Sequence, residues 1–390
     1  MDFELSEEQQ GLRDVSRSLL RDHSAPQHVR SALGGEDADR KLWELGVELG
    51  WTALAIPEPY GGLGQGLAEL TIVAEELGRA AARGPFLPTA LGGFAIARYG
   101  STPLRADLLP ALAEGSAKAA WAVAGTAGWT LPALRMAATP DGDAVVLNGR
   151  KTAAQDAGSA DWLLVTATAD GQPCLIVVER GAPGLQIRRQ QTLDLTRNLY
   201  EVVFDNVRVP ASRRLSASAE AVQALLDAAA TLTAADALGA GTRLLEMTVE
   251  HAKTRVQFGQ PIGGFQAVKH KCADMRMLVQ GTRAAVYYAA MALDAAAGAA
   301  STAGSVTGAD ASEAASTAKA FASDGMSRLA GEALQVHGGV GFTWEHDLHL
   351  FLRRIKTDEQ LYGDAAVHRE RLCEFLVARH GAGQASPAIR

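Results

Sequence analysis

The spacing of apolar residues divides the chain into a helical region, a β-rich region and a second helical region. Near the amino terminus, Leu12, Val15 and Leu19 follow one another at intervals of three and four, which is typical of one face of a helix. Helical spacing continues, with interruptions, to about residue 117. From residue 216 to residue 380, long alanine-rich segments again favour helix, because alanine loses no side-chain entropy on folding.

The middle region, 118–215, has a different pattern. It consists of short runs rich in Val, Leu and Thr, which predict strands at 145–147, 162–165, 175–178 and 202–204. Asp-Gly or Asn-Gly pairs at 141–142, 148–149 and 170–171 predict hairpin turns between such strands. A compact antiparallel barrel or sandwich is therefore expected here.

Together these patterns predict an α+β fold in three parts. We expect an all-helical amino-terminal domain over 1–117, a central antiparallel β-domain over 118–215 and a carboxy-terminal four-helix bundle over 216–380. The Gly/Ser/Thr/Ala stretch 297–310 predicts a loop between two bundle helices, and 381–390 a flexible tail. The order lacks alternating βαβ units, which argues against a Rossmann or P-loop enzyme.

Composition narrows the possible partners. The 37 basic and 44 acidic residues are mixed along the chain, so no basic face for a nucleic-acid backbone is expected. Asp227 and Asp236 interrupt the most apolar alanine-rich stretch, and the amino terminus lacks a secretory-signal pattern. We expect a cytoplasmic protein with no membrane insertion. The three cysteines lack CxxC spacing, so neither disulfides nor a metal site is predicted.

Two glycine-containing motifs carry the most specific information. The first, RVQFGQPIGGFQ, spans residues 255–266, and the second, QVHGGVGF, spans residues 335–342. Together with the PEPYGGLG loop at 57–64, they resemble the acyl-CoA dehydrogenase family over almost the whole chain. Within that family the chain is similar to an actinobacterial-type subfamily, including subunits of heteromeric steroid side-chain acyl-CoA dehydrogenases.

The resemblance implies FAD as cofactor, bound by both motifs across a subunit contact. Arg255 would pair with the pyrophosphate, since a guanidinium can donate two hydrogen bonds to phosphate oxygens. Phe258 would pack near the adenine or flavin, and the paired glycines would let backbone N–H groups approach a phosphate. The cofactor-binding residues implied in this way are Arg255, Gln257, Phe258, Gln266, Gln335, Gly338 and Gly339.

A third flavin contact is implied in the β-domain. The family usually places a tryptophan over the flavin and a threonine at its N5 edge, and the corresponding positions here are Ala153 and Gln155. The Gln155 amide can still donate to the flavin. The smaller Ala153 leaves more room beside the ring.

The implied reaction is α,β-dehydrogenation of an acyl-CoA in lipid metabolism, such as fatty-acid β-oxidation. Electron-transferring flavoprotein is the implied acceptor, and the assembly a homo- or hetero-oligomer, dimeric or tetrameric. The reaction needs a base, normally a glutamate, to remove the α-proton. The two positions where the family carries that glutamate hold Tyr362 and Ala229 here. Tyrosine, with an ordinary pKa near 10, is a poor base at neutral pH.

Two other carboxylates are candidates for the base. Asp236 lies on the same helix face as Ala229, two turns later, and Asp364 follows Tyr362 by two residues. Three hypotheses remain open from the sequence. The chain is a working dehydrogenase with Asp236 or another acid as base, a base-lacking subunit whose partner supplies glutamate, or a repurposed member with different chemistry on an acyl thioester.

Overall fold

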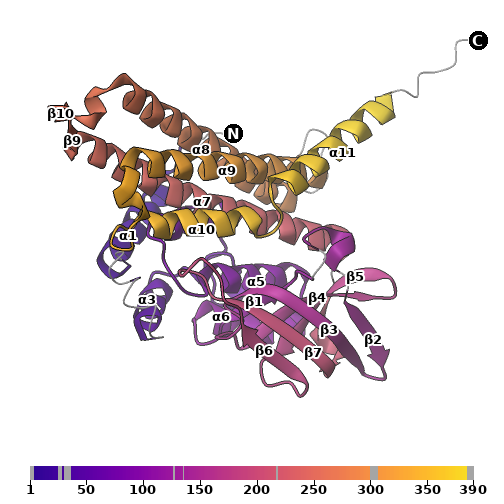
Figure 1. The fold of residues 1–390 in the computed structure, drawn as a ribbon. Coiled ribbons are helices and arrows are strands. Elements are labelled where there is room, and N and C mark those ends of the chain that lie inside the picture. Colours follow the sequence, from indigo (N-terminus) through magenta and orange to yellow (C-terminus); the bar gives the residue numbers. More distant parts are fainter. Residues whose placement is uncertain are drawn as a thin grey trace, which may run out of the picture.

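A computed structural model describes residues 4–24, 29, 37–125, 128–134, 136–216, 218–298 and 306–383. Long helices form one layer, a twisted sheet lies below them, and the amino-terminal helices fill the space beside both (Figure 1). The α+β architecture expected from the sequence is confirmed. Most of the predicted flexible tail, 384–390, lies outside the described residues, as does 299–305 of the predicted inter-helix loop.

The amino-terminal region is helical, as expected. A capping box at its start, in which Ser6 and Gln9 bond each other's backbone N–H groups, begins the first helix. The PEPYGGLG loop folds around a short 3₁₀ turn, η1 (Glu58–Tyr60). The helices are α1 (Glu7–His23), α3 (Asp37–Glu48), α4 (Leu67–Arg79), α5 (Phe86–Tyr99) and α6 (Thr102–Ala113).

The central region forms one eight-stranded sheet in the order β6-β7-β3-β2-β4-β5-β8, with β1 also paired to β4. The pairings are antiparallel except that β1 and β4 are parallel, with a single parallel contact between β2 and β4. This departs from the wholly antiparallel prediction. The strands are β1 (Ala119–Ala122), β2 (Ala137–Asp141), β3 (Ala144–Gln155), β4 (Trp162–Ala169), β5 (Gln172–Glu179), β6 (Leu185–Arg189), β7 (Leu199–Pro210) and β8 (Arg214–Leu215).

The parallel pair has a topological cause. The chain leaves β1, forms the β2–β3 hairpin, and returns to enter β4 from the same end of the sheet. A parallel neighbour requires a long crossover of this kind, and the hairpin supplies it. Nothing in the local residue pattern marks such a crossover, which explains the error.

Two of the three predicted hairpin turns are confirmed. The pairs 141–142 and 170–171 lie at the β2–β3 and β4–β5 hairpins, with positive φ at Gly142, Asp170 and Gly171. The prediction at 148–149 was wrong, because this pair lies inside β3. Gly149 has φ 143°, and the β3–β7 register shifts beside it, so the glycine serves a β-bulge instead of a turn.

The carboxy-terminal helices pack as a bundle in which α7 and α8 both lie against α9. Helix α10 packs on α7 and α9, and α11 on α9. Among the described residues, one helix, α7, is long and apolar enough to cross a membrane, yet 83% of its most apolar window is buried inside the fold. The helices are α7 (Ala219–Thr254), α8 (Gln266–Gly298), α9 (Gly308–His337), α10 (Leu348–Gln360) and α11 (Ala365–Gly383).

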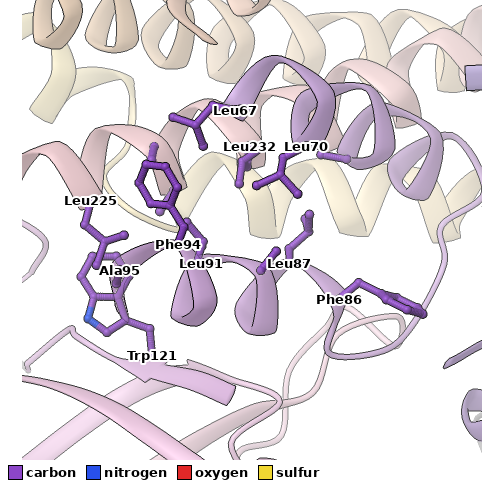
Figure 2. Close-up of a cluster of buried hydrophobic side chains, with 14 of the residues drawn as sticks. Leu67, Leu70, Phe86, Leu87, Leu91, Phe94, Ala95, Trp121, Leu225 and Leu232 are labelled. Carbon is purple, nitrogen blue, oxygen red and sulfur yellow. The ribbon is translucent and has the colours of Figure 1, made fainter. Parts of the chain in front are cut away.

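The largest core joins all three parts of the chain around α5. Figure 2 shows its side chains between the α4 and α7 helices above and the sheet below. Burial of these leucines and aromatic rings supplies the main driving force for docking the parts, at roughly 1.5 to 3 kcal/mol for each large side chain. The labelled residues include Leu67, Leu70, Leu87, Leu91, Phe94, Trp121, Leu225 and Leu232.

Candidate cofactor site and base positions

The first predicted cofactor motif forms a short hairpin where α7 ends and α8 begins. Arg255 is the C-cap residue of α7, and its side chain is exposed. Two-residue strands β9 (Val256–Gln257) and β10 (Gln260–Pro261) pair antiparallel and place Phe258 at the tip. Phe258 is 92% exposed, a high value for a phenylalanine, and Gln266 starts α8 in an exposed position. An aromatic ring held out in this way indicates a surface that is covered by a ligand or partner.

The second predicted motif follows the carboxy-terminal end of α9. Gln335 is exposed on the last turn of that helix, and Gly338 adopts φ 61°. A methyl group added to Gly338 or Gly339 would meet no atom within 4 Å, so this backbone faces open space. Phe342 and Trp344, which follow, are 76% and 52% exposed.

The structure brings these two motifs to the same end of the bundle. The ring of His251, four residues before Arg255, stacks on His337 of α9 with centroids 4.5 Å apart. We call residues 255–266 and 335–344 the bundle-end surface. Its exposed guanidinium, exposed rings and open glycine backbone fit the phosphates and the planar rings of FAD. Figure 1 shows β9 and β10 at the far end of the long helices.

The third predicted contact, Gln155, lies elsewhere. It is the last residue of β3, pairs with Leu199 of β7 and is 9% exposed. Ala153, two residues earlier, has φ 53°, and its backbone N–H donates to the side-chain oxygen of Gln190 at 3.0 Å. In Figure 1 the sheet is well separated from β9 and β10. One chain therefore carries two separate groups of candidate cofactor residues.

Tyr362 is enclosed by aromatic rings. Its ring stacks on Trp121 of β1 with centroids 6.0 Å apart and lies 5.0 Å from the ring of Trp129. The Trp121 indole N–H in turn donates to the hydroxyl of Thr166 at 2.9 Å. Burial raises the pKa of Tyr362 to about 12. The phenol is therefore protonated at neutral pH and is not a competent base there.

Asp236 is fully buried and held by two arginines. Its carboxylate accepts two hydrogen bonds of 2.6 Å from Arg354 of α10, and Arg197 lies 3.2 Å from it. Burial by itself would raise the pKa of Asp236, but Arg354 and Arg197 outweigh this effect and lower the pKa. Both oxygens are thus occupied, and this geometry describes a structural ion pair.

The network around Asp236 connects all three parts of the chain. Arg354 also donates to the Ala82 carbonyl at 2.8 Å, which joins α10 to the segment that follows α4. Arg197, from the β6–β7 connection, bonds Asp358 of α10 as well. Lys319 of α9 donates to the Asp358 carbonyl at 2.7 Å and so stabilises the carboxy-terminal end of α10.

Sequence reasoning missed Arg197, Arg354, Asp358 and Lys319. One signal was present, because Arg354 and Asp358 are four residues apart on a helix face shared with apolar residues.

The structure also shows the surroundings of the other two candidate base positions, Ala229 and Asp364. Ala229 is completely buried in the main core. Asp364 precedes α11, and its side chain accepts a hydrogen bond from the Val367 backbone N–H at 2.9 Å, the geometry of an N-cap. Within the described residues, no group of His, Cys, Asp and Glu side chains is arranged to hold a metal ion.

Comparison with known proteins identifies the class. Three family models match in chain order: the acyl-CoA dehydrogenase N-terminal domain over 6–116, the middle domain over 124–207 and the C-terminal domain over 219–377. The chain is also 35% identical over 370 residues to acyl-CoA dehydrogenase IpdE2 of Mycolicibacterium smegmatis, covering 94% of this chain and 98% of that one. The chain belongs to the acyl-CoA dehydrogenase family.

Similar solved structures support the same family assignment. The Tcur3481-Tcur3483 steroid ACAD G363A variant has a TM-score of 0.85 and 31% identity, covering 97% of this chain and 99% of that chain. The ChsE4-ChsE5 complex of Mycobacterium tuberculosis has a TM-score of 0.86 and 29% identity, with full coverage of both. The protein is an FAD-dependent oxidoreductase of lipid metabolism that acts on acyl-CoA thioesters.

Proposed function

We propose that the chain is one subunit of a hetero-oligomeric acyl-CoA dehydrogenase and that a partner subunit supplies the catalytic carboxylate. The proposal rests on the surroundings of the four candidate positions for the catalytic base. Tyr362 is enclosed by indoles, Ala229 has no acid, Asp236 is held by two guanidinium groups, and Asp364 caps a helix. None of these side chains is a carboxylate that is free to accept a proton.

This chain's contribution lies at the bundle-end surface. In the proposed assembly, Arg255 binds the pyrophosphate of a FAD shared with the partner, and Phe258 covers its rings. The open backbone at Gly338 and Gly339 lets N–H groups approach a phosphate. Bound FAD would supply the acceptor for the hydride that leaves the β-carbon of the acyl thioester. Separation of Gln155 from the bundle-end surface supports a cofactor site built from two chains.

The substrate, partner and location are also proposals. Two similar structures are named as pairs of chains, and one of these is a steroid enzyme. These names support a heteromer that acts on a bulky acyl-CoA, such as one with a steroid side chain. We further propose electron-transferring flavoprotein as the acceptor and the cytoplasm as the location. Burial of the apolar window of α7 in the bundle supports the absence of membrane insertion.

The test compares the chain alone with the chain co-purified with a paralogue that carries the usual glutamate. A general base contributes about 10²–10⁴-fold, so the chain alone should bleach its flavin with acyl-CoA slower by that factor. A partner Glu→Gln variant is the matched control and should remove the difference. Flavin content is measured in every sample, so that a loss of cofactor is not read as a loss of chemistry.

The competing function is a homomeric dehydrogenase that uses Asp236 as its base. It is favoured by the position of Asp236 on the same face of α7 as Ala229. Rapid flavin reduction by the chain alone, abolished by Asp236→Asn without loss of FAD, would establish this second function and exclude the first. If Asp236 is structural, the same substitution instead destabilises the fold.

A further inference from the structure

A cavity of about 370 Å³ lies where the amino-terminal helices meet the β-domain. None of its lining residues belongs to the bundle-end surface, and neither Tyr362 nor Asp236 is among them. Its walls come from α3, the segments before α5 and β1, the β3–β4 connection and the ends of β5 and β7. Its volume falls within the range of small-molecule sites, about 300 to 1,000 Å³.

Positive charge converges on this cavity from three elements. Arg40 projects from α3, Lys118 precedes β1, and Arg180 follows β5. Among the residues that the structure describes, neither Lys118 nor Arg180 forms a salt bridge, and Arg40 has only a 3.7 Å contact with Glu44. The Lys118 ammonium lies 5.0 Å from the centroid of the Trp43 ring, a cation–π contact that leaves its hydrogens available to a ligand.

Of the described residues that line the cavity, three are cationic and one is acidic. The lining includes one carboxylate, Asp156, which is buried and accepts a 3.2 Å hydrogen bond from the Asn198 amide. Asp161, just outside the lining, accepts from the backbone N–H of Lys118 at 2.9 Å. Glu44, which contacts Arg40, and Asp161 also lie beside the cavity, so the unpaired positive charge of the described lining is that of Lys118 and Arg180, and this charge favours an anion.

Two parts of the cavity wall are held in place by packing within the fold. Trp43 stacks on Phe86 with centroids 4.9 Å apart, and its indole N–H donates to the Gly115 carbonyl at 3.0 Å. On the opposite side, a methyl group on Gly158 would come within 2.5 Å of the Tyr200 hydroxyl, so glycine permits this close approach. A cavity with rigid walls loses little entropy when it binds a ligand.

We propose that this cavity binds a small polyanion that carries phosphate or carboxylate groups. Lys118 and Arg180 supply the charge and the hydrogen-bond donors, while the Ser159 hydroxyl, which also lines the cavity, already donates to the Asp156 carbonyl at 3.1 Å. The proposal does not depend on which subunit provides the catalytic base, because the cavity shares no residue with the base positions.

The test is isothermal titration calorimetry on the complete protein, with pyrophosphate in one arm and glutarate in the other. At low salt at least one probe should bind, and added KCl should weaken the binding. Preference for pyrophosphate assigns a phosphate ligand, and preference for glutarate assigns a carboxylate ligand.

The variant Lys118→Gln/Arg180→Gln should raise the dissociation constant at least about tenfold, because it removes two charged hydrogen-bond donors. Arg188→Gln, on exposed β6, is the matched control and should bind as the wild type does. The single variants Lys118→Gln and Arg180→Gln should each show part of the effect, which keeps the test decisive if the double variant unfolds. Failure of both probes to bind, or unaltered binding in the variants, would overturn the proposal.

Discussion

The bundle-end surface and the interior around Asp236 use the same kinds of side chain in opposite ways. At the bundle end, Arg255 is exposed and Phe258 is 92% exposed. In the interior, Arg197 and Arg354 are buried and bonded to carboxylates. An arginine in the first region has its donors free for a ligand, whereas an arginine in the second has already used them within the fold.

The exposed side chains at the bundle end are available for binding a ligand, whereas the buried side chains around Asp236 stabilise the fold. Burying a charge costs several kcal/mol unless partners compensate it, so buried arginines with paired carboxylates depend on one another. They also connect segments that are distant in the chain, as Arg354 does between Asp236 and the Ala82 carbonyl. Substitutions in the interior should therefore change stability, and substitutions at the bundle end should change flavin binding with little effect on stability.

The largest effect is expected from Asp236→Asn. The substitution leaves Arg354 and Arg197 buried with one carboxylate fewer, which should lower the free energy of unfolding by about 3 to 5 kcal/mol. Urea denaturation followed by circular dichroism measures it. Asp324→Asn removes the exposed partner of Arg369 and should cost less than about 1 kcal/mol. Equal losses from the two variants would contradict the contrast between interior and surface.

A second test concerns another buried charge, Lys151 of β3, and uses pH. Lys151 is buried, its ammonium donates to the carbonyls of Val123 and Leu134, and burial lowers its pKa from 10.5 to about 7. Between pH 7 and 10.5 the unfolded chain retains a proton that the folded chain has released. Stability from this group is therefore lowest below pH 7 and rises with pH through that window, by up to about 1.4 kcal/mol per pH unit.

Lys151→Met removes this titration and keeps most of the side-chain volume. The unfolding free energy of the variant should rise less steeply between pH 7 and 9 than that of the wild type. Lys319, whose pKa burial lowers to about 8, contributes with the same sign and remains in both proteins. Parallel pH profiles for the two proteins would show that Lys151 does not titrate in this range.

At the bundle end, Arg255→Ala should weaken FAD retention at least about tenfold, since a charged hydrogen bond contributes about 1.5 to 3 kcal/mol. The unfolding free energy of the flavin-free protein should change by less than about 0.5 kcal/mol, because the side chain is exposed. Flavin absorbance after gel filtration gives the first quantity and urea denaturation the second. Unchanged flavin content together with an unchanged oligomeric state would remove Arg255 from the cofactor site.

The same contrast explains what the sequence could predict. The bundle-end motifs are contiguous stretches, so the pattern of Arg255 to Gln266 could be recognised without knowing the fold. The helix–sheet–helix order also follows from local apolar spacing and is confirmed. The individual roles assigned to all the cofactor residues, from Arg255 and Phe258 to Gly338, Gly339 and Gln155, stay predictions.

The interior could not be predicted in this way. Asp236 and Arg354 are 118 residues apart in the chain, and no local pattern pairs them. Sequence reasoning identified Asp236 as a polar residue on an apolar helix and considered it for the base, but the partners that occupy its oxygens become visible only in three dimensions. The parallel β1–β4 pair was missed for the same reason, since strand neighbours depend on the path of the whole chain.

The smallest expected effect concerns Asp364, where a helix cap and a catalytic base make opposite predictions. As the N-cap of α11, Asp364 accepts from the Val367 N–H, and asparagine caps a helix about as well as aspartate. Asp364→Asn should therefore leave stability nearly unchanged, whereas Asp364→Ala should lower it by about 1 kcal/mol. Flavin reduction by acyl-CoA in the complete assembly should be the same in both. If Asp364→Asn keeps full stability but loses flavin reduction, the carboxylate itself is needed and Asp364 is the base.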